Sequence, residues 1–177
     1  SDSPVRTIVH SDRGDLAFQH YFVREGCGPK VSGFSFDGIA NAELNPLIRE
    51  WLADCDGVII CPSNPFVSVD PMLHLDGFGE ALKSLPVIAV SPIVGGIAIK
   101  GPAAKMMHEL NMPATALAVA DHYQGLIDGF VVDQTDAALV EQFNVPTIST
   151  PSVMVTLQDR IDLARTCVSF LASLSSN

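Results

Sequence analysis

The chain has 177 residues, a length typical of one domain, and 47% of them are hydrophobic while only 17% are charged. This composition excludes a disordered chain and is ample for a hydrophobic core. The 20 acidic residues outnumber the 10 basic ones and give a formal net charge of −10, which excludes binding to nucleic acid or an anionic membrane through surface charge.

From the printed residues we expect neither a signal peptide nor a membrane-spanning segment. No apolar run approaches the roughly 20 residues that span a bilayer, and residues 1–10 lack the apolar core of a signal peptide. The four cysteines, Cys27, Cys55, Cys61 and Cys167, form no Cys-x-x-Cys pair and no Cys/His cluster. This usage is typical of free thiols in a reducing compartment, so we expect a cytoplasmic protein.

The first third of the chain mixes several patterns. Residues 5–10 alternate between apolar and polar side chains, and residues 30–38 alternate with period two and are predicted as a strand that ends at Asp-Gly. The aromatic-rich residues 16–23 fit either a helix or a strand. Residues 45–55 carry apolar side chains at helical spacing and are predicted as a helix.

From residue 57 onward, short apolar runs alternate with helical segments. The predicted strands are 57–61, 86–91, 128–133 and 146–150, and the predicted helices are 77–85, 102–111, 115–127, 136–143 and 156–174. The last helix begins at Thr156 with Asp159 three residues on, close to a capping box. Strands separated by helices pair in parallel through right-handed crossovers. We therefore expect a doubly wound, mostly parallel α/β sheet, Rossmann-like and partial, with helices on both faces, in a single domain over residues 1–177.

The first candidate site follows the first of these strands, because ligands bind beyond the carboxyl ends of the strands in open α/β sheets. There the chain runs into Pro62-Ser63-Asn64-Pro65, where two prolines fix φ on either side of a serine and an asparagine. Such a stiff loop can present side chains and N–H groups to a ligand with little entropy left to lose. In the alternative interpretation, Ser-Asn only turns the chain and Asp70 caps the helix that follows.

The second candidate site follows the next strand. Gly95 and Gly96 allow the backbone to approach a ligand closely, and Gly101 precedes a predicted helix N-terminus that favours an anion. Lys100 and Lys105 lie beside this loop, although a glycine-rich crossover with solvated lysines is an equally good explanation. The segment matches neither a P-loop nor a dinucleotide-binding fingerprint. If the two strands are neighbours, the two loops lie side by side in one crevice.

Four carboxylates, Asp121, Asp128, Asp133 and Asp136, are candidate metal ligands. Asp128 and Asp133 bracket one strand and lie about 16 Å apart, too far for one ion. Asp136 is predicted to be a helix N-cap. These positions favour structural roles over a metal site.

The remaining candidates favour packing over chemistry. The histidines are scattered, and no Gly-x-Ser-x-Gly motif supports a Ser–His–acid triad. His122 and Tyr123 could reach a substrate from their helix, but we expect them to pack. Trp51, Met106 and Met107 lie at helical spacings and are predicted to be core residues.

The segments CDGVIICPSNPFVSVDPML and VIAVSPIVGGIAIKGPAAKMM resemble the 2-phospho-L-lactate transferase family of coenzyme F-420 biosynthesis. Supporting similarity lies in PVRTIV, FQHYFV and ALAVADHYQGLIDGFVVDQTD. The resemblance implies transfer of a phospholactyl or phosphoenolpyruvyl group from a guanosine diphosphate-linked donor to the hydroxyl of a deazaflavin alcohol, with release of GMP and dependence on Mg²⁺.

The resemblance also implies which residues bind the diphosphate and orient the deazaflavin. They are Pro62, Ser63, Asn64, Pro65, Ser68, Ser91, Pro92, Ile93, Val94, Gly95, Gly96, Lys100 and Gly101. Which loop binds which group stays open. No catalytic residue and no metal ligand is assigned, and the ligands of Mg²⁺ are expected outside this chain.

The sequence departs from the family at its beginning. Family members begin with a glycine-rich strand–loop–helix and an acidic pair implied to hold the metal, and neither is present in this sequence. We therefore expect the C-terminal portion of a larger transferase, either a fragment or one subunit of a split enzyme, which is inactive alone. It is expected to expose an apolar surface that packs against the missing portion or, in a homodimer, against a second copy.

Two other functions stay open. A related family of nucleotide-sugar-binding regulators has Gly-Pro-Gly-Ser in place of residues 62–65 and lacks the Ser-Pro-Ile-Val-Gly-Gly segment, so the sequence favours the transferase. The chain could also be a non-catalytic module that docks to a partner carrying the missing half.

Overall fold

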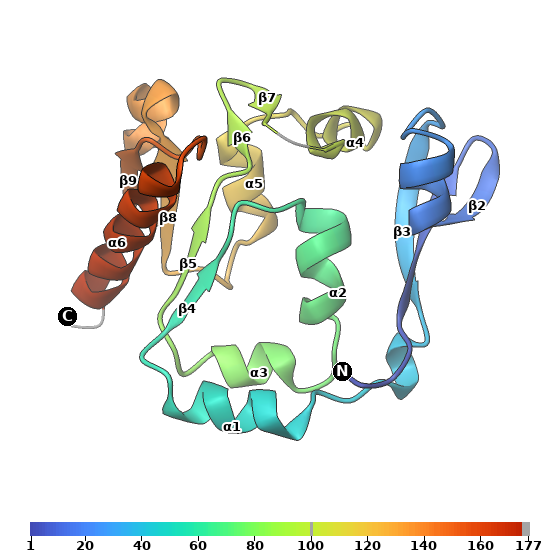
Figure 1. The fold of residues 1–177 in the computed structure, drawn as a ribbon, viewed down its shortest axis with the longest axis horizontal. Helices are drawn as coiled ribbons and strands as arrows, with labels where there is room; N and C mark the ends of the chain where they lie inside the picture. The colour runs from blue at the N-terminus through green and yellow to red at the C-terminus, as the bar shows by residue number, and fades with distance from the viewer. Residues whose placement is uncertain (100, 175–177) are drawn as a thin grey trace.

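A four-stranded parallel sheet with the order β4-β5-β8-β9 is the larger of the two main sheets (Figure 1). The computed structural model describes residues 1–99 and 101–174. The strands of this sheet are β4 Val58–Ile60, β5 Val87–Val90, β8 Gly129–Asp133 and β9 Thr147–Thr150. Their spatial order follows the chain order, so each crossover advances in the same direction across the sheet. The predicted α/β class, with parallel strands and helices on both faces, is confirmed.

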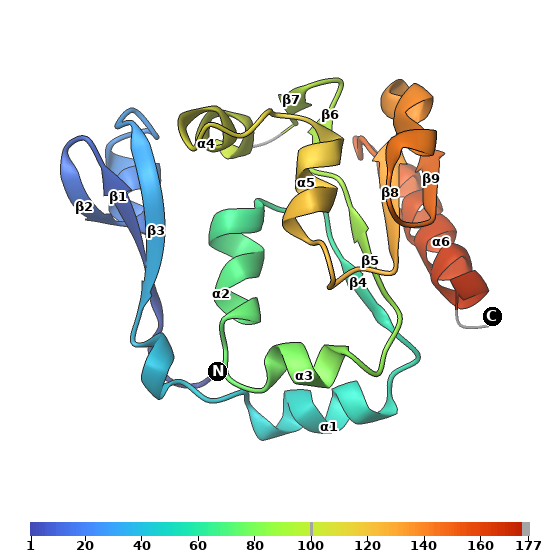
Figure 2. The same cartoon turned by 180° about the vertical axis from the view of Figure 1, so that it is seen from behind.

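Helices cover both faces of this sheet (Figures 1 and 2). The described helices are α1 Pro46–Asp54, α2 Asp70–Leu73, α3 Phe78–Leu82, α4 Ala103–Glu109, α5 Ala116–His122 and α6 Leu157–Leu174. Of these, α6 packs on one face, and α4 and α5 pack in the core on the other. Because side chains alternate along a strand, Ile88 and Val90 pack in the core beneath α6. Val87 and Ala89 pack in the opposite core, with Met106 of α4. Both β5 and β8 are buried along their whole length, which explains their continuous apolar sequences.

Helix α6 covers one face through a stripe of apolar side chains. Leu163, Cys167 and Leu171 recur every four residues and are buried in one cluster with the sheet. Its N-terminus has the predicted capping box: the Thr156 N–H donates to Asp159 Oδ2 at 2.7 Å, and the Asp159 N–H donates to Thr156 Oγ1 at 3.2 Å.

A three-stranded antiparallel sheet of order β2-β1-β3 flanks the parallel sheet (Figure 2). It consists of β1 Arg6–Ser11, β2 Gly14–Ala17 and β3 Val31–Asp37, and a π-helix, His20–Arg24, follows β2. The undecided residues 16–23 therefore begin in a strand and end in a helix. Val9, Tyr21 and Val31 are buried in the same cluster as β5 and β8, so one continuous core joins the two sheets.

The connections contain several short elements. These are the π-helix Pro65–Val69, the 3-10 helices Ile39–Asn41 and Gln134–Gln142, and the hairpin strands β6 Ile93–Val94 and β7 Ile97–Ala98. Residues 136–143 were predicted as an ordinary helix and lie mostly in the second 3-10 helix. The four cysteines carry free thiols, as predicted.

The surface carries more apolar side chains than the helix patterns suggested. The prediction that Trp51 is a core residue is wrong: its side chain is 68% exposed, because α1 lies outside the main layers, next to α3, and contributes no buried residue. Met106 and Met107 are buried as predicted.

None of the described helices is long and apolar enough to cross a bilayer.

Candidate functional site

A pocket of about 620 Å³ opens at the carboxyl ends of β4 and β5. The predicted site residues that line it are Pro62, Ser63, Asn64, Ser68, Ser91, Pro92, Val94 and Gly101. The residues that complete its lining are Phe18, Phe22, Val67, Ile99, Pro102, Ser152, Val153, Met154 and Arg160. Because β4 and β5 are neighbouring parallel strands, the two predicted loops lie side by side, as expected.

The first loop turns the chain, as the alternative interpretation holds, and it also presents side chains to the pocket. Asn64 Oδ1 accepts a hydrogen bond of 3.0 Å from the Phe66 N–H and so caps the π-helix Pro65–Val69, while its amide nitrogen lies 3.2 Å from Met106 Sδ. Ser63 and Ser68 line the pocket, and within the described part of the chain their hydroxyls have no partner. The loop is thus a stiff turn that leaves two hydroxyls available to a ligand.

The second loop uses most of its polar groups to hold its own shape. The buried Ser91 hydroxyl donates to the Ile93 carbonyl at 2.8 Å and accepts from the Ile93 N–H at 3.1 Å. Gly95 and Gly96 have φ of +55° and +79° and form the two-residue turn between β6 and β7, where left-handed backbone is required. The Gly95 N–H donates to Asp136 at 3.0 Å. The glycine pair thus serves a hairpin and does not line the pocket.

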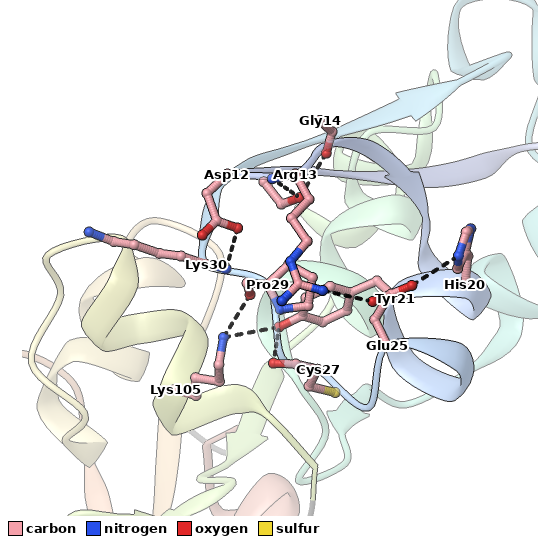
Figure 3. Close-up of polar contacts among 11 residues, drawn as sticks. Asp12, Arg13, Gly14, His20, Tyr21, Glu25, Cys27, Pro29, Lys30 and Lys105 are labelled. Atoms are coloured by element: carbon pink, nitrogen blue, oxygen red, sulfur yellow. Dashed lines mark hydrogen bonds and ion pairs between the residues drawn. The ribbon is translucent and has the colours of Figure 1, made fainter.

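Other predicted residues also lie away from the pocket. Pro65 and Ile93 are buried behind the loops. Lys100 lies outside the described residues. Lys105 was expected to attract an anion, but its ammonium lies 2.6 Å from Glu109 Oε1. It also lies 2.9 Å from the Pro29 carbonyl, as Figure 3 shows. That expectation is wrong because Lys105 points toward the antiparallel sheet.

Of the residues that the structure describes, the cation that lines the pocket is Arg160 in the first turn of α6. Among the described residues it has no ion-pair partner. Together with Ser152, it follows the carboxyl end of β9. Ligands in open α/β sheets bind beyond the carboxyl ends of the strands. For the predicted strand 146–150, this rule points to the residues that follow it, which include Ser152 and Arg160.

An aromatic pair forms another wall. Phe18 and Phe22 stack with their ring centroids 5.5 Å apart and line the pocket at the π-helix after β2. The apolar pattern over residues 16–23 did not settle their secondary structure, and the one signal for this segment was the resemblance of FQHYFV to the transferase family.

Asp133 holds two segments beside the pocket together. Its carboxylate accepts hydrogen bonds from the N–H and hydroxyl of Ser152 at 2.8 and 3.1 Å, and from the N–H and hydroxyl of Thr135 at 2.9 and 2.7 Å. Burial raises the pKa of Asp133, but these hydrogen bonds outweigh burial and bring the pKa below its ordinary value. The ionised side chain therefore fixes the position of Ser152 in the pocket wall.

The other carboxylates have structural roles, as the sequence favoured. Asp128 accepts a hydrogen bond from the Val87 N–H at 2.8 Å. Asp136 was predicted to cap a helix and does not: Asp133 caps the 3-10 helix by accepting from Thr135, while Asp136 accepts from Gly95.

The described residues do not fit a Mg²⁺ ion. No group of three His, Cys, Asp or Glu side chains among them is placed to hold a metal. The polar side chains that the described residues contribute to the pocket are Asn64, serine hydroxyls and one guanidinium, whereas Mg²⁺ prefers carboxylates. An Mg²⁺ ion at this pocket would therefore need ligands from outside the described residues.

His122 packs, as expected, and takes no part in the pocket. Its Nε2 atom lies 2.8 Å from Asp70 Oδ1, and its ring meets the Phe66 ring edge-on. Asp70 does not cap a helix through its side chain, contrary to the prediction, because this carboxylate is paired with His122. Burial raises the pKa of the neighbouring Tyr123 well above its ordinary value, so its hydroxyl stays protonated.

Comparison with known proteins matches this chain to one family. The family model described as "2-phospho-L-lactate transferase CofD" matches residues 1–159. A 2-phospho-L-lactate transferase from Methanococcoides burtonii is 36% identical over 177 residues, covering 98% of this chain and 58% of the relative. One from Halobacterium salinarum is 35% identical and covers 99% of this chain and 51% of the relative. The chain thus spans about half the length of these curated relatives.

Solved structures show the same fold. A member of the UPF0052 family from Bacillus halodurans is 17% identical and superposes with a TM-score of 0.58, covering 93% of this chain and 59% of that structure. A second crystal structure of a Bacillus halodurans protein gives a TM-score of 0.61 at 16% identity and covers 95% of this chain and 60% of that structure. At this identity the likeness establishes the fold alone.

Proposed function

We propose, because the chain belongs to the 2-phospho-L-lactate transferase CofD family, that its pocket takes part in phospholactyl transfer. In this reaction the hydroxyl of a deazaflavin alcohol attacks a phosphorus atom of a guanosine diphosphate-linked donor. The new phosphate ester carries the phospholactyl or phosphoenolpyruvyl group, the bond to the leaving phosphate breaks, and GMP departs. The hydroxyl proton goes to solvent or to a base.

One observation carries this proposal: two loops that are distant in sequence meet at one pocket. Ser63 follows β4 and Ser91 follows β5, and the pairing of these strands places both residues in the lining. The same two loops carry the strongest resemblance to the transferase family. Transfer at a diphosphate depends chiefly on positioning and charge stabilisation, which stiff loops and a cation supply.

The polar and the aromatic residues of the lining are suited to different parts of the substrates. Ser63, Ser68 and Arg160 are suited to phosphate oxygens, because hydroxyls and a guanidinium donate hydrogen bonds to anions. Phe18 and Phe22 are suited to the flat ring of a deazaflavin, which stacks on aromatic side chains. In Figure 1 the π-helix after β2 and α6 lie on opposite sides of the loop after β4. We therefore assign the donor to the α6 side and the acceptor to the aromatic side.

Titration of the deazaflavin alcohol into the chain, followed by deazaflavin fluorescence, tests this assignment. We expect saturable binding, and we expect Phe22→Ala to weaken it roughly tenfold because one stacking partner is lost. Val23→Ala is the matched control, since Val23 lies on the same π-helix, is exposed and does not line the pocket. Equal losses in the two variants, or no binding by the wild type, would contradict the assignment.

A thermal-shift comparison separates the transferase from the nucleotide-sugar-binding regulators. GDP is expected to raise the melting temperature of the chain, because a ligand that binds only the folded state stabilises it. A UDP-sugar at the same concentration is expected to have no effect. Selective stabilisation by the UDP-sugar would overturn the proposal, and stabilisation by neither nucleotide would favour the docking module.

A further inference from the structure

We propose that Lys105 and Glu109 of α4 position the aromatic wall of the pocket, formed by Phe18 and Phe22, and thereby set the affinity for the acceptor. This inference rests on the proposed function for the identity of the ligand. The two charged residues, called the clamp below, lie outside the pocket lining and touch no ligand, so they act as positioning residues.

Lys105 binds the segment that follows the π-helix. Its ammonium donates to the Pro29 carbonyl at 2.9 Å and lies 3.5 Å from the Tyr21 hydroxyl, as Figure 3 shows. The same ammonium lies 5.8 Å from the centroid of the Tyr21 ring. One side chain of α4 thus contacts both the π-helix and the turn that leads into β3.

Glu109 binds the first residue of β3, next to the Pro29 carbonyl that Lys105 contacts. Its Oε2 atom accepts a hydrogen bond of 3.0 Å from the Val31 N–H, and both of its carboxylate oxygens lie within 2.7 Å of the Lys105 ammonium. Pro29 and Val31 are therefore held through their backbones by an ion pair on one helix. The pair spans positions i and i+4, which face the same side of α4.

Tyr21 connects the clamp to the aromatic wall. It is fully buried, lies between Phe18 and Phe22 in sequence, and its hydroxyl lies 3.4 Å from the Cys27 carbonyl. Phe18 and Phe22 stack on each other, so the pair moves together with the π-helix that carries Tyr21. Any shift of Tyr21 toward or away from α4 therefore shifts the wall of the pocket.

The clamp differs from an ordinary surface ion pair. The side chains of Lys105 and Glu109 are 35% and 17% exposed, whereas those of the Lys83–Glu80 pair are 71% and 76% exposed. Burial lowers the pKa of Lys105, but its contacts with Glu109 and Tyr21 outweigh burial and bring the pKa above its ordinary value. Lys105 is thus charged at neutral pH, and its three donors are directed at protein acceptors.

Amide hydrogen exchange of the ligand-free chain tests the positioning directly. We expect Lys105→Met to speed exchange across residues 20–31 by roughly tenfold or more, while the amides of β8 keep their protection and report an intact fold. Lys105→Arg is expected to restore most of the protection, because arginine can still donate to Pro29 and Glu109. Lys83→Met removes an exposed ion pair and serves as the matched control, with no expected change. Unchanged exchange at residues 20–31 in Lys105→Met would overturn the proposal.

Affinity for the deazaflavin alcohol tests the consequence for the site. We expect the Kd to rise roughly fivefold or more in Lys105→Met and to return toward wild type in Lys105→Arg. The double variant Lys105→Glu with Glu109→Lys keeps an ion pair but reverses the donors and acceptors that face Pro29 and Val31, so it is expected to bind as weakly as Lys105→Met. Wild-type affinity in the reversed pair, or in Lys105→Met despite faster exchange, would overturn the positioning role. If the wild type itself does not bind, the proposed function fails, and hydrogen exchange alone then decides whether the clamp holds the wall.

Discussion

Asp133 is a buried carboxylate whose charge is balanced by hydrogen-bond donors. Its four donors come from Ser152 and Thr135, on segments that follow different strands. No basic side chain pairs with it among the described residues. Its ionised form therefore ties the end of β8 to the pocket wall, and its pKa is below the ordinary value.

We predict that Asp133→Asn lowers the free energy of unfolding by about 1–3 kcal/mol at neutral pH, because the new amide N–H₂ faces donors. A folded-state pKa below the unfolded value of about 3.9 means that the carboxylate contributes its full stability above that value. That contribution is lost as the pH falls through the folded-state pKa. Urea unfolding at pH 7 and at about pH 3 should therefore show a smaller difference between the two proteins in acid. The exposed Asp54, replaced in the same way, is the control; equal differences at both pH values would contradict the prediction.

Arg160 is predicted to bind the anionic donor. Arg160→Ala should weaken binding of GDP roughly tenfold, and the loss should shrink in high salt because the contact is electrostatic. Isothermal titration with GDP measures both effects. Arg165→Ala provides the control, since Arg165 lies on the same helix, is exposed and does not line the pocket. A similar loss of GDP affinity in both variants would contradict the prediction, because it would show that the affinity depends on the net charge of α6 and not on the position of Arg160.

At the scale of elements, the packing of α6 on β8 depends on a glycine. A Cβ atom added at Gly129 would lie 2.8 Å from Phe170 Cζ and 2.9 Å from Leu174 Cδ1. We predict that Gly129→Ala destabilises the chain by about 1–3 kcal/mol, because α6 side chains must move to make room. Gly79→Ala is the control: no atom lies near its added Cβ, and alanine favours the helix by about 0.5–1 kcal/mol. Thermal unfolding of both variants should give shifts of opposite sign.

The elements that the sequence predicted well are those governed by local rules. The buried runs of β5 and β8 and the capping box at Thr156 need only hydrophobic pattern and side-chain chemistry. The β6–β7 hairpin was missed because Gly95 and Gly96 equally suit a ligand loop, and only the pairing of Ile93 with Ala98 decides between them.

Of the candidate site, the sequence predicted the two loops but not the residues that reach the pocket through long-range packing. The loops after β4 and β5 follow from the rule that ligands bind at the carboxyl ends of parallel strands. Phe18 and Phe22 reach the pocket only because the antiparallel sheet packs beside α4, a contact that no local pattern encodes. Lys105 was misassigned for the same reason, since its partners Pro29 and Tyr21 are distant in sequence.

The whole molecule exposes apolar side chains, as its composition suggested. Leu47 and Trp51 on α1, together with Val155 and Leu157 at the start of α6, are exposed. Part of the 47% of the chain that is hydrophobic therefore lies on its surface.

We predict that the 177-residue chain, given donor, acceptor and Mg²⁺, forms no coupled deazaflavin product. The reason is that the described residues lack a group of carboxylates suited to the metal. Chromatography of the deazaflavin products measures the outcome. The full-length relative from Methanococcoides burtonii serves as the positive control, and product formed by the chain alone would contradict the prediction.

The walls of the pocket come from nearly the whole chain, from Phe18 to Arg160. During synthesis the first aromatic wall is made long before α6, so the pocket does not exist until the chain has grown past Arg160. Pairing of β4 with β5 and of β5 with β8 also requires contacts across long stretches of chain, which form slowly. A nascent or truncated chain that ends before α6 would therefore present Ile88 and Val131 to its surroundings, and the arrival of α6 is the step that both buries this face and completes the pocket.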